Sequence, residues 1–141
     1  MVNNLENILN LIYSKLYIKS SVNNDFTLDA EDDNGYIEYK RNMNNCSMDR
    51  ISKYATQMLW RISENTKKPY AIYYIGVDDD GSIVGISLSD AIITVDNFVR
   101  VCENIQASIT GIEIISVNNK NVIKIGVKMK KHKDESQLLD I

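Results

Sequence analysis

The sequence has few of the residues on which small secreted proteins and metalloproteins depend. Its 141 residues include two cysteines and one histidine. Neither Cys46 nor Cys102 has another cysteine or a histidine nearby at metal-ligand spacing, so neither a structural zinc site nor a disulfide framework is predicted. The single histidine, His132, lies in a lysine-rich stretch near the C-terminal end, which argues against a nucleophile activated by histidine.

Long apolar runs are also missing. No charged-then-apolar signal peptide begins the chain, and no apolar stretch reaches the length of a membrane span. The net charge is −3, whereas a dedicated nucleic-acid-binding domain is normally basic overall. We therefore expect a soluble, cytoplasmic protein with no membrane partner.

The sequence lacks a phosphate-binding loop as well. Residues 76–82 have the glycine spacing of such a loop, but Ser82 stands where the loop needs lysine, and three aspartates would repel phosphate. The same stretch lacks two of the oxygen donors of a calcium loop. The aspartates fit a hairpin turn instead, and no cofactor is predicted for this chain.

Hydrophobic periodicity predicts an α+β fold. Helices are expected over 3–18, over 47–64 and from Ser87 or Ser89 to Ile105, and strands over 36–41, 70–77, 82–87, 108–117 and 121–130. The order α-β-α-β-β-α-β-β corresponds to a mixed sheet packed with helices. The predicted organisation is an amino-terminal helix (1–18), an acidic loop (19–34), an α+β domain (35–130) and a polar linker (131–141).

One predicted strand combines an acid with an amine. Glu38 and Lys40 lie two residues apart and therefore share one face of the strand. Metal-dependent nucleases use such a pair, in which the acid holds Mg²⁺ and the lysine places the attacking water or the phosphate. Asp33 and Asp78 would complete a carboxylate cluster at one end of the sheet. The alternative interpretation is a surface salt bridge between strands.

Three motifs in a fixed order carry a resemblance to a known family. An acidic group (31–33) precedes Ile-Glu-Tyr-Lys (37–40), the second helix contains Thr-Gln-Met-Leu-Trp-Arg (56–61), and Ile-Gly-Val-Asp-Asp-Asp-Gly-Ser-Ile-Val-Gly follows (75–85). This pattern resembles the amino-terminal region of the elongation-factor-like GTP-binding proteins of types one and two, in the translational GTPase superfamily. The likeness covers about residues 31–130, and its helix motif is the most specific part.

That resemblance implies a non-catalytic accessory domain. In the family a GTPase domain follows this region, so the residues that bind GTP and Mg²⁺ would lie beyond Ile141. Residues 131–141 would be the linker to a GTPase domain absent from this chain. The parent protein would hydrolyse GTP, whereas this domain would dock to the ribosome or RNA, or to the GTPase domain.

The residues proposed for partner binding come from the second helix and from the basic C-terminal edge. Trp60 has two interpretations, a packing or domain-docking residue and a recognition anchor for the ribosome or RNA. The candidate partner-binding residues are Gln57, Trp60, Arg61, Lys128, Lys130 and Lys131.

A weaker resemblance points to the Schlafen-type, AlbA-like fold. That family has an acid, then four residues, then a Glu-x-Lys strand, and it has a similar Ile-Gly-Val-Asp-Asp hairpin. Asp33, Glu38, Lys40 and Asp78 would match its RNase carboxylates and lysine, although Asp33 departs from the family's usual glutamate. The alternative function is therefore a metal-dependent RNase domain. A third alternative is a protein-interaction module without a nucleic-acid role.

Overall fold

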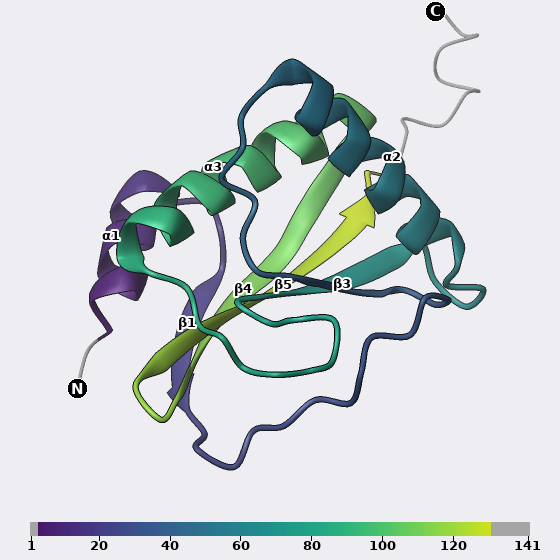
Figure 1. The fold of residues 1–141 in the computed structure, drawn as a ribbon. Coiled ribbons are helices and arrows are strands. Elements are labelled where there is room, and N and C mark those ends of the chain that lie inside the picture. Colours follow the sequence, from purple (N-terminus) through teal and green to yellow (C-terminus); the bar gives the residue numbers. More distant parts are fainter. Residues whose placement is uncertain (1–2, 131–141) are drawn as a thin grey trace, which may run out of the picture.

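The structure, a computed structural model, describes residues 3–130. Three helices cover one face of a five-stranded sheet with the strand order β1-β4-β5-β3-β2 (Figure 1). The elements are α1 (Asn4–Ile12), β1 (Ile18–Val22), β2 (Ile37–Lys40), α2 (Met48–Ser63), β3 (Tyr70–Ile75), α3 (Leu88–Ile105), β4 (Ala107–Val117) and β5 (Lys120–Met129). The predicted linker 131–141, with Lys131, lies outside the described residues. None of the helices within 3–130 is both long and apolar enough to cross a lipid bilayer.

The sheet is mixed, which confirms the predicted α+β class. Its three central strands pair antiparallel, β4 with β5 and β5 with β3. Each edge strand is added in parallel, β1 beside β4 and β2 beside β3. The observed order of elements is α-β-β-α-β-α-β-β, so the predicted order was wrong in two places.

The first difference is an unpredicted edge strand, β1. The segment Ile-Lys-Ser-Ser-Val is short and polar, and it gained its strand conformation by pairing with β4. The amino-terminal helix is correspondingly shorter than 3–18, because α1 ends at Ile12 and the chain then turns toward β1. Asn3 caps this helix, since its side chain accepts hydrogen bonds from the N–H groups of Leu5 and Glu6.

The second difference is the absence of a strand over 82–87. After the aspartate turn the chain makes one isolated bridge, between Val77 and Ile83. The N–H groups of Val84 and Gly85 then both donate to the carbonyl oxygen of Gly76. The backbone therefore curls over the end of β3, because Gly76, Gly81 and Gly85 all have positive φ angles that break an extended course.

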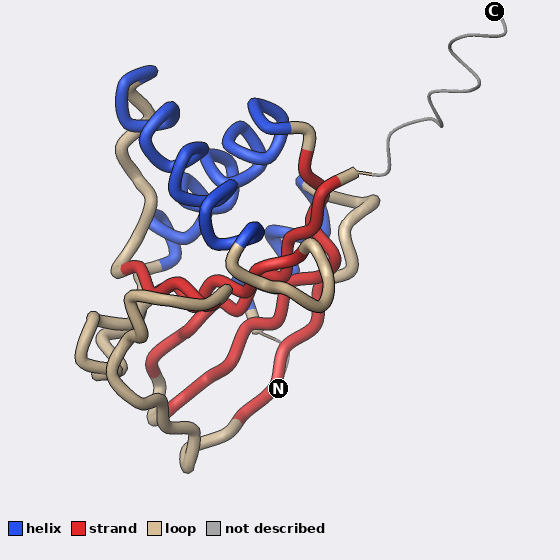
Figure 2. Tube along the Cα trace, turned by 90° about the vertical axis from the view of Figure 1, so that its right-hand side faces the viewer, coloured by secondary structure: helices blue, strands red, loops and turns tan. Residues whose placement is uncertain are grey.

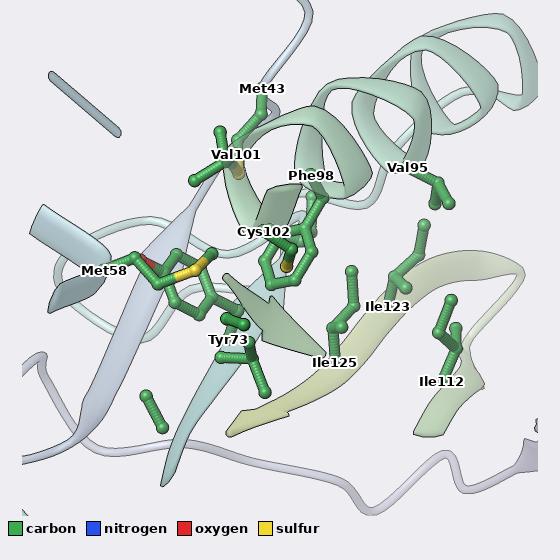
Figure 3. Packing of buried hydrophobic residues seen from close by; sticks show 14 of the residues in the cluster. Met43, Met58, Tyr73, Val95, Phe98, Val101, Cys102, Ile112, Ile123 and Ile125 are labelled. Atoms are coloured by element: carbon green, nitrogen blue, oxygen red, sulfur yellow. The ribbon is translucent and has the colours of Figure 1, made fainter. Parts of the chain in front are cut away.

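The main core lies between the helices and the sheet. Alternation along β3 and β5 directs one row of side chains toward the helices, including Tyr73 and Ile125. Phe98 of α3 packs edge-to-face on Tyr73 with ring centroids 5.1 Å apart (Figure 3). Both rings are almost fully buried, so this contact anchors α3 to the centre of the sheet.

A second, smaller core lies on the opposite face of the sheet. The loop between β1 and β2 crosses that face at one end, and its residues Phe26 and Leu28 pack against Tyr39, Val77 and Val122. Figure 2 shows the helices on one side of the sheet and this loop on the other. The loop positions the acidic residues 29–33 beside β2.

Gly81 holds that loop against the aspartate turn. Its φ angle is +89°, and a Cβ atom there would collide with the carbonyl oxygens of Leu28 and Asp29. The N–H group of Glu31 donates to the carbonyl oxygen of Asp79 at 2.6 Å. The loop and the turn therefore touch through backbone atoms, which leaves no room for a side chain at Gly81.

The glycine pair Gly81 and Gly35 provides a test of this contact. Gly35 has nearly the same φ angle, +90°, but nothing lies within 4 Å of its Cβ position. We expect Gly35→Ala to cost about 1–3 kcal/mol of unfolding free energy from backbone strain alone. Gly81→Ala should cost about 1–3 kcal/mol more, because the methyl group also displaces the loop. Urea denaturation of both variants measures the difference, and equal losses would contradict the proposed loop contact.

Candidate functional site

Polar side chains converge at the β2 edge of the sheet, close to α2 and the aspartate turn. They line an open pocket of about 610 Å³. Three of the four residues predicted for a nuclease site, Glu38, Lys40 and Asp78, line it together. Asp33 does not, and Glu31, which the sequence analysis did not select, takes its place.

Arg61 of α2 is the centre of this site and is almost completely buried, with 3% of its surface exposed. Its Nε donates to Glu38 Oε2 at 2.6 Å. Its Nη1 donates to the carbonyl oxygens of Asp32 and Gly35, each at 3.0 Å. Its Nη2 lies 3.7 Å from Glu31 Oε2. The guanidinium thus joins α2, β2 and the preceding loop, and it is turned into the protein rather than toward a partner.

Glu38 is as deeply buried as Arg61 and has two basic neighbours. In addition to Arg61, Lys40 Nζ lies 3.5 Å from Glu38 Oε1. A buried carboxylate needs such compensation, because removing a charge from water is costly. The surface salt bridge between strands that the sequence analysis weighed does not form at Glu38, because this carboxylate is buried and pairs with a helix arginine and with Lys40 of its own strand.

Glu31 closes the site from the loop side. Burial raises the pKa of its carboxyl group, while the hydrogen bond from the backbone N–H of Tyr39 opposes that shift. That bond, 2.5 Å long, gives an acceptor to an N–H group on edge strand β2. Glu31 therefore contributes to the site both as a counter-charge for Arg61 and as a cap on the sheet edge.

Asp78 forms a separate ion pair, with Arg41. Both of its carboxylate oxygens accept hydrogen bonds from the guanidinium of Arg41. The bond from Arg41 is the main reason that the pKa of the Asp78 carboxyl group is lowered. Asp78 and Glu38 line one pocket, yet each carboxylate is paired with its own arginine.

This arrangement has consequences for metal chemistry. Within residues 3–130, no three His, Cys, Asp or Glu side chains are grouped so that they could hold a metal ion. A metal-dependent nuclease needs carboxylates that are free to bind the ion. Here Glu31 and Glu38 are offset by Arg61 and Lys40, so the geometry favours a structural junction.

The other partner-binding candidates have different environments. Trp60 is 42% exposed, and Arg61 Cζ lies 4.9 Å from its ring centroid. Gln57 is half-buried and lines the polar pocket. Lys128 and Lys130 are exposed at the end of β5.

An apolar groove beside Leu59 was missed in the sequence analysis. It encloses about 410 Å³ and is lined by Leu59, Ile62, Pro69 and Met129, with Lys67 and Lys68 among its other lining residues. Leu59 is 44% exposed. The run Leu59-Trp60 places two large apolar side chains off the buried stripe of α2, and that was the available sequence signal.

The paired carboxylates of the site differ in what they contribute to stability. We expect Glu38→Gln to lower the unfolding free energy by about 3 kcal/mol, because it leaves a buried guanidinium with less compensation. Glu31→Gln should cost less than about 1 kcal/mol, since glutamine keeps an acceptor for Tyr39 and removes a carboxylate that burial already disfavours. Urea unfolding at neutral pH compares the two variants; a larger loss for Glu31→Gln would refute this ranking.

Comparison with known proteins identifies relatives of this chain. The chain is 45% identical over 139 residues to uncharacterized protein R625 of Acanthamoeba polyphaga mimivirus, a match that covers 94% of this chain and 74% of R625. It is 34% identical over 122 residues to GTP-binding protein 2 of Mus musculus and of Homo sapiens. That match covers 84% of this chain but only 20% of each GTP-binding protein 2. The chain matches no protein-family model and no solved structure. On these identities and coverages, the chain belongs to the family of mimivirus protein R625, and it is related to a segment of GTP-binding protein 2.

Proposed function

We propose that this chain is a non-catalytic docking domain that works with a GTP-binding, elongation-factor-like protein. The observation that carries the proposal is the similarity of most of the chain to one fifth of GTP-binding protein 2. The sequence offers no phosphate-binding loop, and the polar site has its charges compensated internally. GTP and Mg²⁺ would therefore belong to the partner rather than to these residues.

The share of each relative that this chain matches suggests how such a domain acts. The matched region makes up 74% of R625, and the rest of that protein is smaller than the matched domain itself. That remainder leaves little room for a further α/β domain. In R625 the matched domain would therefore meet a GTPase as a separate chain, whereas in GTP-binding protein 2 the corresponding segment is part of one long chain.

The surface best suited to this contact is the α2 patch, which we define as Leu59, Trp60 and the adjoining groove. A half-exposed tryptophan is a common anchor of protein interfaces, and its neighbour Leu59 lines the groove. Arg61 lies beneath the Trp60 ring and holds it in place from the inside. Lys67 and Lys68 line the groove, so an acidic rim on the GTPase domain would complement the patch.

The metal-dependent RNase remains the competing function, and the pairing of its carboxylates speaks against it. Glu38 would have to release Arg61 to bind a metal ion, which would leave an uncompensated buried guanidinium. Asp33 is exposed and does not line the pocket. A protein-interaction module without any GTPase partner would use the same α2 patch and differs only in what it binds.

Calorimetric titration tests the docking proposal. The chain is titrated into the part of mouse GTP-binding protein 2 outside the matched segment, and the matched mouse segment serves as the positive control. We expect micromolar binding and a loss of at least about tenfold with Trp60→Ala, which corresponds to about 1.4 kcal/mol. Met48→Ala is the matched control, because Met48 is 87% exposed at the other end of the same helix.

Three results would count against docking through this patch. Binding of the mouse segment without binding of this chain would exclude a shared partner. Absence of binding by both would exclude docking between separate chains. Equal effects of Trp60→Ala and Met48→Ala would place the contact elsewhere.

A further inference from the structure

The sheet face opposite the helices is covered at only one end. The loop between β1 and β2 packs over Tyr39, Val77 and Val122, and Figure 2 shows the strands continuing beyond it. Because Ala71, Tyr73 and Ile75 point into the main core, their neighbours on β3 must point to this second face. Those neighbours are Tyr70, Ile72 and Tyr74, all of them only partly buried.

Lysines accompany these tyrosines on the neighbouring strands. In the β3–β5 register, Tyr70 lies opposite Lys128 and Tyr74 lies opposite Lys124. Lys124 Nζ is 5.9 Å from the centroid of the Tyr74 ring. Across the sheet, Glu113 of β4 lies between Lys124 and Lys19 of β1. Aromatic and basic side chains therefore alternate over this face, which is open around Tyr17 and Tyr70 and bounded at Tyr74, where Phe26 of the loop packs with ring centroids 6.0 Å apart.

A shallow pocket opens at the centre of this surface. It encloses about 280 Å³ and lies between Tyr17 and Tyr70. Gly111 and Gly126 face each other across β4 and β5, and the Thr110 side chain lies beside Gly126, with its Oγ1 against the Cβ position of that glycine. Tyr17 is 70% exposed, and its ring lies 3.7 Å from the Cβ position of Gly111. The pocket is smaller than most sites for drug-sized ligands, and its lining includes two tyrosines on which a flat ring could stack.

The charge of the surface is opposite to that of the whole chain. Lys19, Lys124 and Lys128 outnumber Glu113, and none of the three lysines forms a salt bridge within residues 3–130. The acidic residues that make the net charge negative gather in the 25–33 loop and the aspartate turn. The net charge therefore does not describe this face.

We propose that this surface, defined by Tyr17, Tyr70, Tyr74, Lys19, Lys124 and Lys128, binds single-stranded RNA. Unpaired bases stack on tyrosine rings exposed on a sheet, and lysines beside the rings contact the phosphates. A protein partner would not need this alternation of rings and cations. The surface is separate from the α2 patch, so the inference stands without the docking proposal.

Glu113 favours RNA over DNA as the occupant. A carboxylate on a phosphate-binding surface needs hydrogen-bond donors on the ligand, and the ribose 2′-OH is a donor that DNA lacks. Glu113 is already oriented by a hydrogen bond from Ser21 Oγ at 3.2 Å. Glu113 lines the same pocket as Tyr17 and Gly126.

Fluorescence anisotropy with a labelled single-stranded RNA of about 12 nucleotides tests this inference. We expect binding in low salt that weakens at least about fivefold with Tyr17→Ala, because stacking of one base is worth about 1–3 kcal/mol. Tyr17 is suited to the test because it is highly exposed. Tyr17→Phe keeps the ring and should keep the affinity.

The contribution of the lysines is tested by measuring how the affinity for RNA depends on salt concentration. Lys128→Gln should lower the slope of log K against log salt by about 0.7, the value for one phosphate contact of a single strand. Lys53→Gln on α2 removes the same charge from an exposed side chain on the helix side and should leave the slope unchanged. Each variant is compared with wild type by circular dichroism, so that unfolding is recognised.

The proposal fails if the RNA does not bind in low salt, or if Tyr17→Ala and Lys128→Gln bind as wild type. Preference for duplex RNA would also overturn it, because stacked bases cannot reach the tyrosines. Equal affinity for DNA of the same sequence would refute the assignment to RNA. With RNA preferred, Glu113→Ala should reduce the ratio of the two affinities, and an unchanged ratio would remove Glu113 from the account.

Discussion

A buried guanidinium constrains this domain more than any other single group. Arg61 can lie under the surface of α2 only if acceptors surround it, and these come from separate parts of the chain. Glu38 comes from an edge strand, while the carbonyl oxygens of Asp32 and Gly35 come from the loop before that strand. Helix, strand and loop must therefore assemble together around one charge.

Because Arg61 is buried and compensated, the polar site and the surfaces of the molecule have different roles. Carboxylates that resemble a nuclease site are used to compensate Arg61 and Arg41. The Trp60 ring lies against the outer side of Arg61 and remains exposed. The second face of the sheet lies on the other side of the molecule from the helices (Figure 2), and the β1–β2 loop packs against only one end of it. The interior of the polar site thus stabilises the fold, and we propose the α2 patch and the second face of the sheet as the surfaces that meet partners.

The sequence predicted the long elements well, because their hydrophobic periods are clear. Helix α2 and strands β3, β4 and β5 appeared within a few residues of their expected bounds. Strand β1 could not be found in the same way, since an edge strand that is mostly polar shows no alternation of its own. The 82–87 segment was misassigned because its apolar residues looked like a hairpin partner, whereas the positive φ angles of Gly81 and Gly85 turn the chain away.

Only part of the candidate site could be predicted from residue patterns. Glu38, Lys40 and Asp78 were brought together as predicted, because strand alternation and the turn after β3 fix their positions. Arg61 was expected at a surface, since a helix arginine is exposed unless some distant residue compensates it. Glu31 was overlooked for the related reason that its role depends on the fold of an irregular loop. Which of several neighbouring acids meets a buried base is decided by tertiary contacts that spacing alone does not encode.

The claim that the carboxylates are structural is tested most directly by an RNA cleavage assay. The purified chain is incubated with Mn²⁺ and structured RNA beside Glu38→Gln and Asp78→Asn, each checked for folding at the assay temperature. Asp78→Asn changes an exposed ion pair and so separates loss of chemistry from loss of fold. The account predicts no cleavage above that of either variant. Cleavage by the wild-type chain that disappears in folded Asp78→Asn or folded Glu38→Gln would contradict it and would make the polar pocket an active site.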